Sequence, residues 1–160
     1  MGTKSVGRRP EGGMRVTGVT PAGRTTTMDD AEGGGGPSPI DTLLIALAGC
    51  TAMDVLSILR KKRLEVTAYQ VETTAIQRED YPKVFTRMDV VHVVAGPALD
   101  TAGVRRAVEL SALKYCPVSA MLCAGTVELH HRYRIERPDV APEEGEVVVR
   151  SRYLARGYWR

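Results

Sequence analysis

Residues 38–62 constrain the fold more than any other part of this sequence, because they are predicted to form one long helix. Ser38 can cap its N-terminus, Pro39 suits the first helical turn, and Asp41 places a carboxylate at the positive end of the helix dipole. Basic residues 60–63 stand at the other end, where cations are favoured. The chain must therefore be built around this element.

The predicted helix carries apolar side chains in every direction around its axis, and a helix of this kind is expected to be buried on all sides. One subunit of 160 residues would struggle to cover it, so we expect a second subunit to help. Gly49 lies beside Cys50 and would let another backbone or a ligand approach the thiol. The apolar positions are Ile40, Leu43, Leu44, Ile45, Leu47, Met53, Val55, Leu56, Ile58 and Leu59.

The residues before Cys50 also resemble a bacterial lipoprotein cleavage box, with Cys50 as the lipid attachment site. A signal peptide normally occupies the first 15–30 or so residues. Here a long charged, glycine-rich segment comes first, and Asp41 and Asp54 interrupt the apolar run, which is marginal for a membrane span of about 20 residues. A buried helix in a soluble protein, in the cytoplasm by default, is the better prediction.

Composition narrows the class of protein. At 160 residues the chain is expected to form one domain, or one subunit of a small oligomer. A net charge of +3 is too small to indicate a nucleic-acid partner. Three cysteines without paired spacing disfavour a disulfide framework and a structural zinc site, which leaves free or redox-cycling thiols.

The part before the helix divides into three segments. Residues 1–12 lack any period and are predicted to be a flexible N-terminus. Residues 14–20 and 24–29 flank a Pro-Ala-Gly turn and predict a β-hairpin. Arg24, beside that turn, is either a solvated arginine or a cation directed at a neighbouring site. The glycine-rich residues 31–38 lack the pattern of a phosphate-binding loop and are predicted to be a connector.

After the helix, residues 64–77 and 84–95 alternate apolar and polar side chains and predict two strands, the first with a bulge near residues 68–69. His92 shares the apolar face of the second strand, and a histidine in that position is usually a core residue with satisfied hydrogen bonds. Asp100 opens a further helix that should end at Cys116, because the residue before a proline is disfavoured in helices.

A short new helix is predicted over residues 117–123, which would put Cys116 at a helix N-terminus, where a thiolate is favoured. Residues 127–135 predict another strand, on which His130 and His131 face opposite ways and cannot chelate one metal together. Residues 147–153 are a weak candidate for an edge strand. The predicted fold is α+β, with antiparallel β-hairpins around a long buried central helix. The predicted boundaries are residues 1–12, 13–136 (the domain) and 137–160 (a C-terminal extension).

Cys50 and Cys116 lie in the surroundings that thiol–peroxide chemistry requires, although buried cysteines are also common without function. In this chemistry one thiolate attacks the O–O bond and becomes a sulfenic acid, which a second thiol traps as a disulfide. An external dithiol can then reduce the disulfide.

Two sequence motifs resemble those of the OsmC/Ohr family, in the order that the family has them. The first, on the long helix, consists of GPSP at residues 36–39, leucines at 43, 44 and 47, and Gly49-Cys50-Thr51. The second is KYCPVS at residues 114–119, followed by Gly125. The resemblance covers residues 14–135, and the residues after Gly49 are those of the OsmC-like subgroup.

The resemblance implies an OsmC-like fold and an intertwined homodimer with each active site at the subunit interface. It implies that Cys50 is the peroxidatic thiol and Cys116 the resolving thiol, in the reduction of organic hydroperoxides by lipoyl-type or other dithiols. It implies no metal and no bound cofactor. Cys123 matches no motif and is predicted to be a core residue.

The sequence departs from the Ohr pattern at two places. Ile40 stands where Ohr-type members carry a glutamate, with Asp41 one place later, and Arg24 is only a candidate for the arginine that those members place against the thiol. Without a cation, an apolar environment would raise the pKa of Cys50. These departures favour the alternative function, a dimeric protein that binds a hydrophobic small molecule without turnover.

Overall fold

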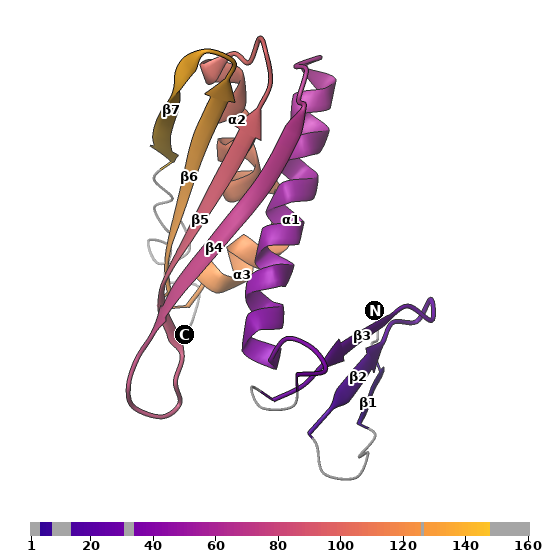
Figure 1. The fold of residues 1–160 in the computed structure, drawn as a ribbon. Helices are drawn as coiled ribbons and strands as arrows, with labels where there is room; N and C mark the ends of the chain where they lie inside the picture. The colour runs from indigo at the N-terminus through magenta and orange to yellow at the C-terminus, as the bar shows by residue number, and fades with distance from the viewer. Residues whose placement is uncertain (1–3, 8–13, 31–33, 126, 148–160) are drawn as a thin grey trace. The chain divides into compact units, whose positions relative to one another are not determined.

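The computed structural model describes residues 4–7, 14–30, 34–125 and 127–147. The chain divides into two units, Met1–Ile45 and Ala46–Arg160, and the boundary falls within the long helix α1 (Pro39–Lys61) (Figure 1). The α+β fold class predicted from the sequence is confirmed.

The first unit holds a three-stranded antiparallel sheet of β1 (Lys4–Gly7), β2 (Val16–Val19) and β3 (Thr25–Met28). Strands β2 and β3 are the predicted hairpin, and Gly23 in their turn takes a positive φ of 77°, which glycine adopts without strain. Strand β1 pairs with β2 and was not predicted, because it lies in the segment expected to be a flexible N-terminus.

Helix α1 begins as the sequence predicts. Ser38 Oγ accepts a hydrogen bond from the amide of Asp41, and the Asp41 carboxylate accepts one from the amide of Ser38. This reciprocal arrangement satisfies two amides at the helix start. Arg60 and Lys61 lie in the last turn, where cations are favoured.

Burial of α1 on all sides is not observed within one chain. Its fully buried side chains form one stripe at four-residue spacing, whereas the side chain of Met53 is 76% exposed. A single chain thus covers one face of this helix. By length and composition alone α1 is also apolar enough to cross a membrane, a test that the core helix of a soluble protein passes equally. The buried stripe is Leu47, Thr51, Val55 and Leu59.

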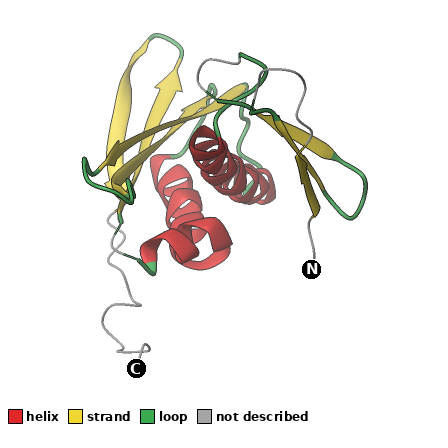
Figure 2. Ribbon diagram, turned by 90° about the horizontal axis from the view of Figure 1, so that it is seen from below, coloured by secondary structure: helices red, strands yellow, loops and turns green. Residues whose placement is uncertain are grey.

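The second unit is a four-stranded sheet with helices against one face (Figure 2). Its order is β4 (Ala68–Gln77), β5 (Phe85–Ala95), β6 (Glu128–Arg137) and β7 (Val140–Val147). The β4–β5 hairpin was predicted, but its irregularity lies at Ile76/Gln77 and not near residues 68–69. Strands β5 and β6 are parallel, a pairing that the expected antiparallel hairpins did not include.

Parallel strands need a crossover, and here it consists of α2 (Thr101–Leu110), a single π-helical turn η1 (Ser111–Tyr115) and α3 (Pro117–Cys123). Asp100 caps α2 as predicted, since its carboxylate accepts from the amides of Ala102 and Gly103. The core lies between this crossover, the sheet and α1. Its buried members are Val55, Leu59, Val94, Leu99, Val104, Ala107, Val108, Tyr133, Ile135 and Val147.

Strand β7 lies within the predicted C-terminal extension and pairs with β6. It begins earlier than the candidate edge strand over residues 147–153, of which residues 148–153 lie outside the described part of the chain. The alternation of β7 buries Val147 in the core, so this part of the extension belongs to the second unit.

Candidate functional site

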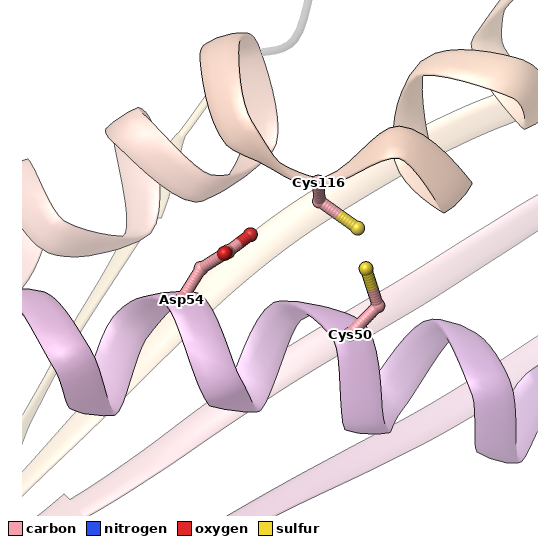
Figure 3. A group of neighbouring side chains, drawn as sticks. All are labelled: Cys50, Asp54 and Cys116. Atoms are coloured by element: carbon pink, nitrogen blue, oxygen red, sulfur yellow. The ribbon is translucent and has the colours of Figure 1, made fainter. Parts of the chain in front are cut away.

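The two predicted thiols meet on one side of α1 (Figure 3). The Sγ atoms of Cys50 and Cys116 and a carboxylate oxygen of Asp54 all lie within 4.8 Å of one another. Cys50 and Asp54 are four residues apart on α1, which places both on the same helix face. Cys50 and Asp54 are half-buried and Cys116 is 2% exposed, so the group is open on the α1 side.

Local backbone geometry positions Cys116 between η1 and α3. Its amide donates to the carbonyl oxygen of Ser111 at 2.9 Å, which closes the π turn, and Pro117 forces it into an extended conformation with ψ of 106°. Its Sγ then caps α3 and accepts a hydrogen bond from the amide of Ser119 at 3.3 Å. The predicted helix junction at Cys116 is therefore confirmed.

Asp54 is oriented by the same π turn. Ser111 Oγ donates to Asp54 Oδ2 at 3.1 Å, and Ser111 is fully buried. Ser111 thus contacts Cys116 through its carbonyl group and Asp54 through its hydroxyl group. Because π turns insert one extra residue into a helix, they often occur where a chain brings functional groups together.

The electrostatics of the site favour the neutral form of Cys50. Its pKa is raised from 9.0 to about 11, chiefly by burial and then by the hydrogen bond to Cys116, while the amide of Val118 opposes the increase. The charge of Asp54 adds to the increase. At pH 7 only about one molecule in ten thousand would carry this thiolate. No arginine, lysine or histidine of the described residues forms an ion pair with Asp54.

This geometry permits two kinds of chemistry. Two adjacent thiols can exchange between dithiol and disulfide, with the S–S bond near 2.05 Å closing after a modest movement. Two sulfurs and a carboxylate are also a ligand set for a thiophilic cation. Neither cysteine is in a disulfide in this structure.

The other predicted residues have different surroundings. Cys123 is buried at the end of α3, as expected of a core residue, and burial raises its pKa. Arg24 and Asp41 belong to the first unit. Arg24 is exposed and its amide donates to Thr20 Oγ1, while the Asp41 side chain accepts from Ser38 Oγ at 2.7 Å. A role for either at the thiol site stays a prediction.

Two histidines form a buried pair on the sheet face beneath the helices. The rings of His92 and His131 are stacked with centroids 5.9 Å apart, and both residues are fully buried. The hydroxyl group of Tyr69 lies 2.7 Å from His92 Nδ1. His92 is a core residue as predicted, but its Nε2 has no partner among the described residues, and neither ring nitrogen of His131 has one. His130 faces the other way, as predicted, and contacts Glu146.

A groove of about 620 Å³ opens beside the C-terminal half of α1. Its apolar wall includes Met53 and Leu56, which are 76% and 39% exposed. Arg60 and Arg63 line the same groove. This surface could accept an apolar molecule that carries an anionic group.

Asp54 and Ser111 are site residues that the sequence reasoning missed, whereas Ser119 was identified as part of the second motif but given no role. Asp54 entered only as an interruption of the apolar run. Its position four residues after Cys50 was the available signal, because that spacing places a carboxylate beside the thiol. Ser111 carries no such signal, since its contact depends on a π turn.

Comparisons with known proteins agree with this fold. The sequence model of the family described as OsmC-like protein matches residues 31–132. Protein YhfA of Escherichia coli strain K12 is 40% identical over 123 residues, covering 77% of this chain and 91% of YhfA.

Solved structures share the fold at lower identity. An OsmC-like protein from Mycoplasma pneumoniae superposes with a TM-score of 0.71 at 12% identity, covering 84% of this chain and 95% of that one. The organic hydroperoxide resistance protein OhrB of Bacillus subtilis superposes with a TM-score of 0.55 at 17% identity, covering 85% and 98%.

Proposed function

Because the chain belongs to the OsmC-like family, we propose that it reduces organic hydroperoxides with Cys50 and Cys116 as its redox pair, in defence against oxidative stress. The observation that carries the proposal is the approach of the two sulfurs, which lie within 4.8 Å although 66 residues separate them in sequence. One of them is half-buried and can be reached by a small peroxide.

The proposed reaction has three balanced steps. The Cys50 thiolate attacks the distal oxygen of ROOH, the O–O bond breaks, and after proton uptake the products are ROH and a sulfenic acid on Cys50. The Cys116 thiol attacks that sulfur, which forms the disulfide and releases water. An external dithiol, of the lipoyl type or another, returns two electrons and two protons and is itself oxidised.

The raised pKa of Cys50 sets the expected pH dependence. A pKa raised in the folded protein means that the neutral thiol dominates at pH 7, so attack on peroxide is slow unless a cation approaches. For the isolated chain we expect the rate of Cys50 oxidation to rise about tenfold per pH unit until the pH nears that pKa. A rate independent of pH between 6 and 9 would indicate a cation at the thiol.

Support for the substrate class comes from the fold shared with OhrB, whose name refers to organic hydroperoxide resistance. The apolar α1 around the thiols suits fatty or aromatic peroxides better than hydrogen peroxide. We further propose a cytoplasmic homodimer without a bound cofactor.

The test is thiol mapping after one equivalent of cumene hydroperoxide. The wild type is expected to form a Cys50–Cys116 disulfide, identified by mass spectrometry and formed faster at pH 9 than at pH 7, and Cys50→Ser to form none. Cys116→Ser should accumulate a sulfenic acid on Cys50 that a dione reagent traps. The matched control is Cys123→Ser, which keeps both redox thiols and should behave as the wild type. Thiols that stay reduced, or a wild type that oxidises without joining Cys50 to Cys116, would rule the proposal out.

A second candidate is a binding protein for a hydrophobic small molecule, and the groove beside α1 favours it. Its apolar wall and two arginines suit an amphipathic anion. Met53→Glu would remove apolar surface and add a negative charge, and should abolish binding of a fluorescent fatty acid. Cys50→Ser should leave such binding intact, which separates this function from thiol chemistry.

The exposed apolar face of α1 also supports the proposed homodimer. Met53 and Leu56 would be covered by a second copy, since large apolar patches on soluble proteins usually mark interfaces. Light scattering should give twice the mass of one chain, and Met53→Glu should give a monomer. A monomeric wild type would leave the same residues available to a ligand.

A further inference from the structure

We propose that Cys50, Cys116 and Asp54 form a binding site for a thiophilic divalent cation, with Zn²⁺ as the representative ion. The proposal rests on the convergence of three ligand atoms from two elements of the second unit (Figure 3). It uses the thiols of the proposed redox function but does not depend on that function. The resemblance to the OsmC/Ohr family implies no metal, so a cation site would be a property of this chain beyond those that the resemblance implies.

The spacing of the three atoms fits a tetrahedral ion. Zinc binds sulfur at about 2.3 Å and carboxylate oxygen at about 2.1 Å, so two ligands of one ion lie roughly 3.5–3.8 Å apart. The three atoms here are each within 4.8 Å of the other two. Closing around an ion therefore needs shifts of about 1 Å or less, which side-chain rotation on α1 can supply.

The surroundings orient these ligands in the way that metal sites require. Ser111 Oγ holds Asp54 Oδ2 at 3.1 Å, and the amide of Ser119 holds Cys116 Sγ at 3.3 Å. Hydrogen bonds of this kind to ligating groups fix their direction and contribute to metal affinity. Both serines are fully buried, so the supporting groups are held by the core.

The charge of the site also favours the binding of a cation. Three groups that bind metals as anions face one another, and within the described ranges no basic side chain pairs with Asp54. Two sulfurs select Zn²⁺ and similar soft ions over Mg²⁺ or Ca²⁺, which prefer oxygen. Three protein ligands leave the fourth position open, as in zinc sites that accept water or substrate.

Binding has a defined proton balance. Each thiol must lose its proton to ligate, so one Zn²⁺ bound by both cysteines releases two protons to the buffer. A bound ion would occupy both sulfurs and prevent their reaction with a hydroperoxide. If the chain is a peroxidase, the ion would therefore act as a reversible inhibitor that a chelator removes.

The test is direct titration of the reduced full chain with Zn²⁺ by calorimetry, and with Co²⁺ by absorption. We expect one ion per chain, release of two protons when buffers of different ionisation enthalpy are compared, and a sulfur-to-cobalt charge-transfer band. Cys50→Ser and Cys116→Ser should each lose the band. Asp54→Asn, which keeps the shape of the side chain, should lower the affinity by at least about tenfold.

Two controls make the outcome specific. Cys123→Ser removes a cysteine outside the site, and Asp80→Asn removes a carboxylate in the turn between β4 and β5, so both should bind as the wild type does. Absence of the cobalt band, binding that survives Cys50→Ser, or equal affinity in Asp54→Asn would overturn the proposal. The titration contains no hydroperoxide, so its failure would leave the proposed redox function standing.

Discussion

Mild acid should destabilise this protein through its buried histidine pair. The pKa of His92 is lowered from 6.5 to about 3, mainly by burial and then by the charge of His131. The pKa of His131 is lowered from 6.5 to about 4, again mainly by burial, with a smaller contribution from His130. Both rings therefore stay neutral in the folded state at pH 5, whereas both become protonated in the unfolded chain.

The sign and size of the effect follow from proton linkage. A lowered folded-state pKa means that the unfolded chain binds more protons, so stability is present above pH 6.5 and falls as the pH drops toward the folded values. Between pH 7 and pH 5, each histidine should lower the free energy of unfolding by about 2 kcal/mol, and the pair should lower it by about 4 kcal/mol. The carboxylates with lowered pKa values, Asp89, Glu143 and Glu146, protonate in the unfolded chain mostly below pH 5.

The assay is urea unfolding at pH 7 and pH 5, followed by circular dichroism. His131→Leu should halve the difference to about 2 kcal/mol, because it removes one of the two buried titrating rings, and neither nitrogen of that ring has a hydrogen-bond partner among the described residues. His130→Gln, on the opposite face of β6, should keep most of the difference. A wild type whose stability changes by less than about 1 kcal/mol over this interval would refute the reasoning.

Three further predictions concern the site and the core. Asp54→Asn removes the carboxylate charge, which is the smallest of the causes that raise the pKa of Cys50, and should speed iodoacetamide alkylation of Cys50 at pH 8 about twofold. Slower alkylation of Asp54→Asn than of the wild type would contradict the electrostatic account. Leu59→Ala should lower the free energy of unfolding by about 2–5 kcal/mol, because Leu59 is fully buried, while Leu56→Ala should cost the isolated chain much less. Gly96→Ala should lower the free energy of unfolding by about 1–3 kcal/mol, because the added Cβ would collide with the carbonyl oxygen of Glu65. Gly49→Ala should be tolerated, because a Cβ at this position meets no atom within 4 Å. Urea unfolding of each variant measures these differences.

The elements with strong local signals were predictable from the sequence. Ser38 and Asp41 mark the start of α1, Asp100 caps α2, and Pro117 ends the helix at Cys116. Alternation of apolar and polar residues predicted β4, β5 and β6, because successive side chains of a strand face opposite sides of the sheet. Local chemistry decides these features, so a single sequence reveals them.

Features that depend on distant partners were not predictable in this way. Strand β1 has only four residues, and its pairing with β2 supplies what its own sequence does not indicate. The parallel pairing of β5 and β6 depends on how the crossover packs, which no local pattern encodes. The exposed side of α1 was expected to be buried, because composition cannot tell cover by the same chain from cover by a second copy.

The residues of the candidate site also differ in whether a local signal in the sequence indicates them. Cys50 and Cys116 were identified from two motifs, and the structure brings their sulfurs together. Asp54 joined them only in three dimensions, because its contact with Ser111 depends on the π turn.

The most direct test of the proposed function is steady-state reduction of cumene hydroperoxide by the purified chain with a lipoyl-type dithiol as reductant. We predict turnover that saturates with hydroperoxide, is lost in Cys50→Ser and in Cys116→Ser, and persists in Cys123→Ser. Turnover that is no faster than the dithiol alone, or that survives Cys50→Ser, would contradict the account and leave ligand binding as the function to pursue.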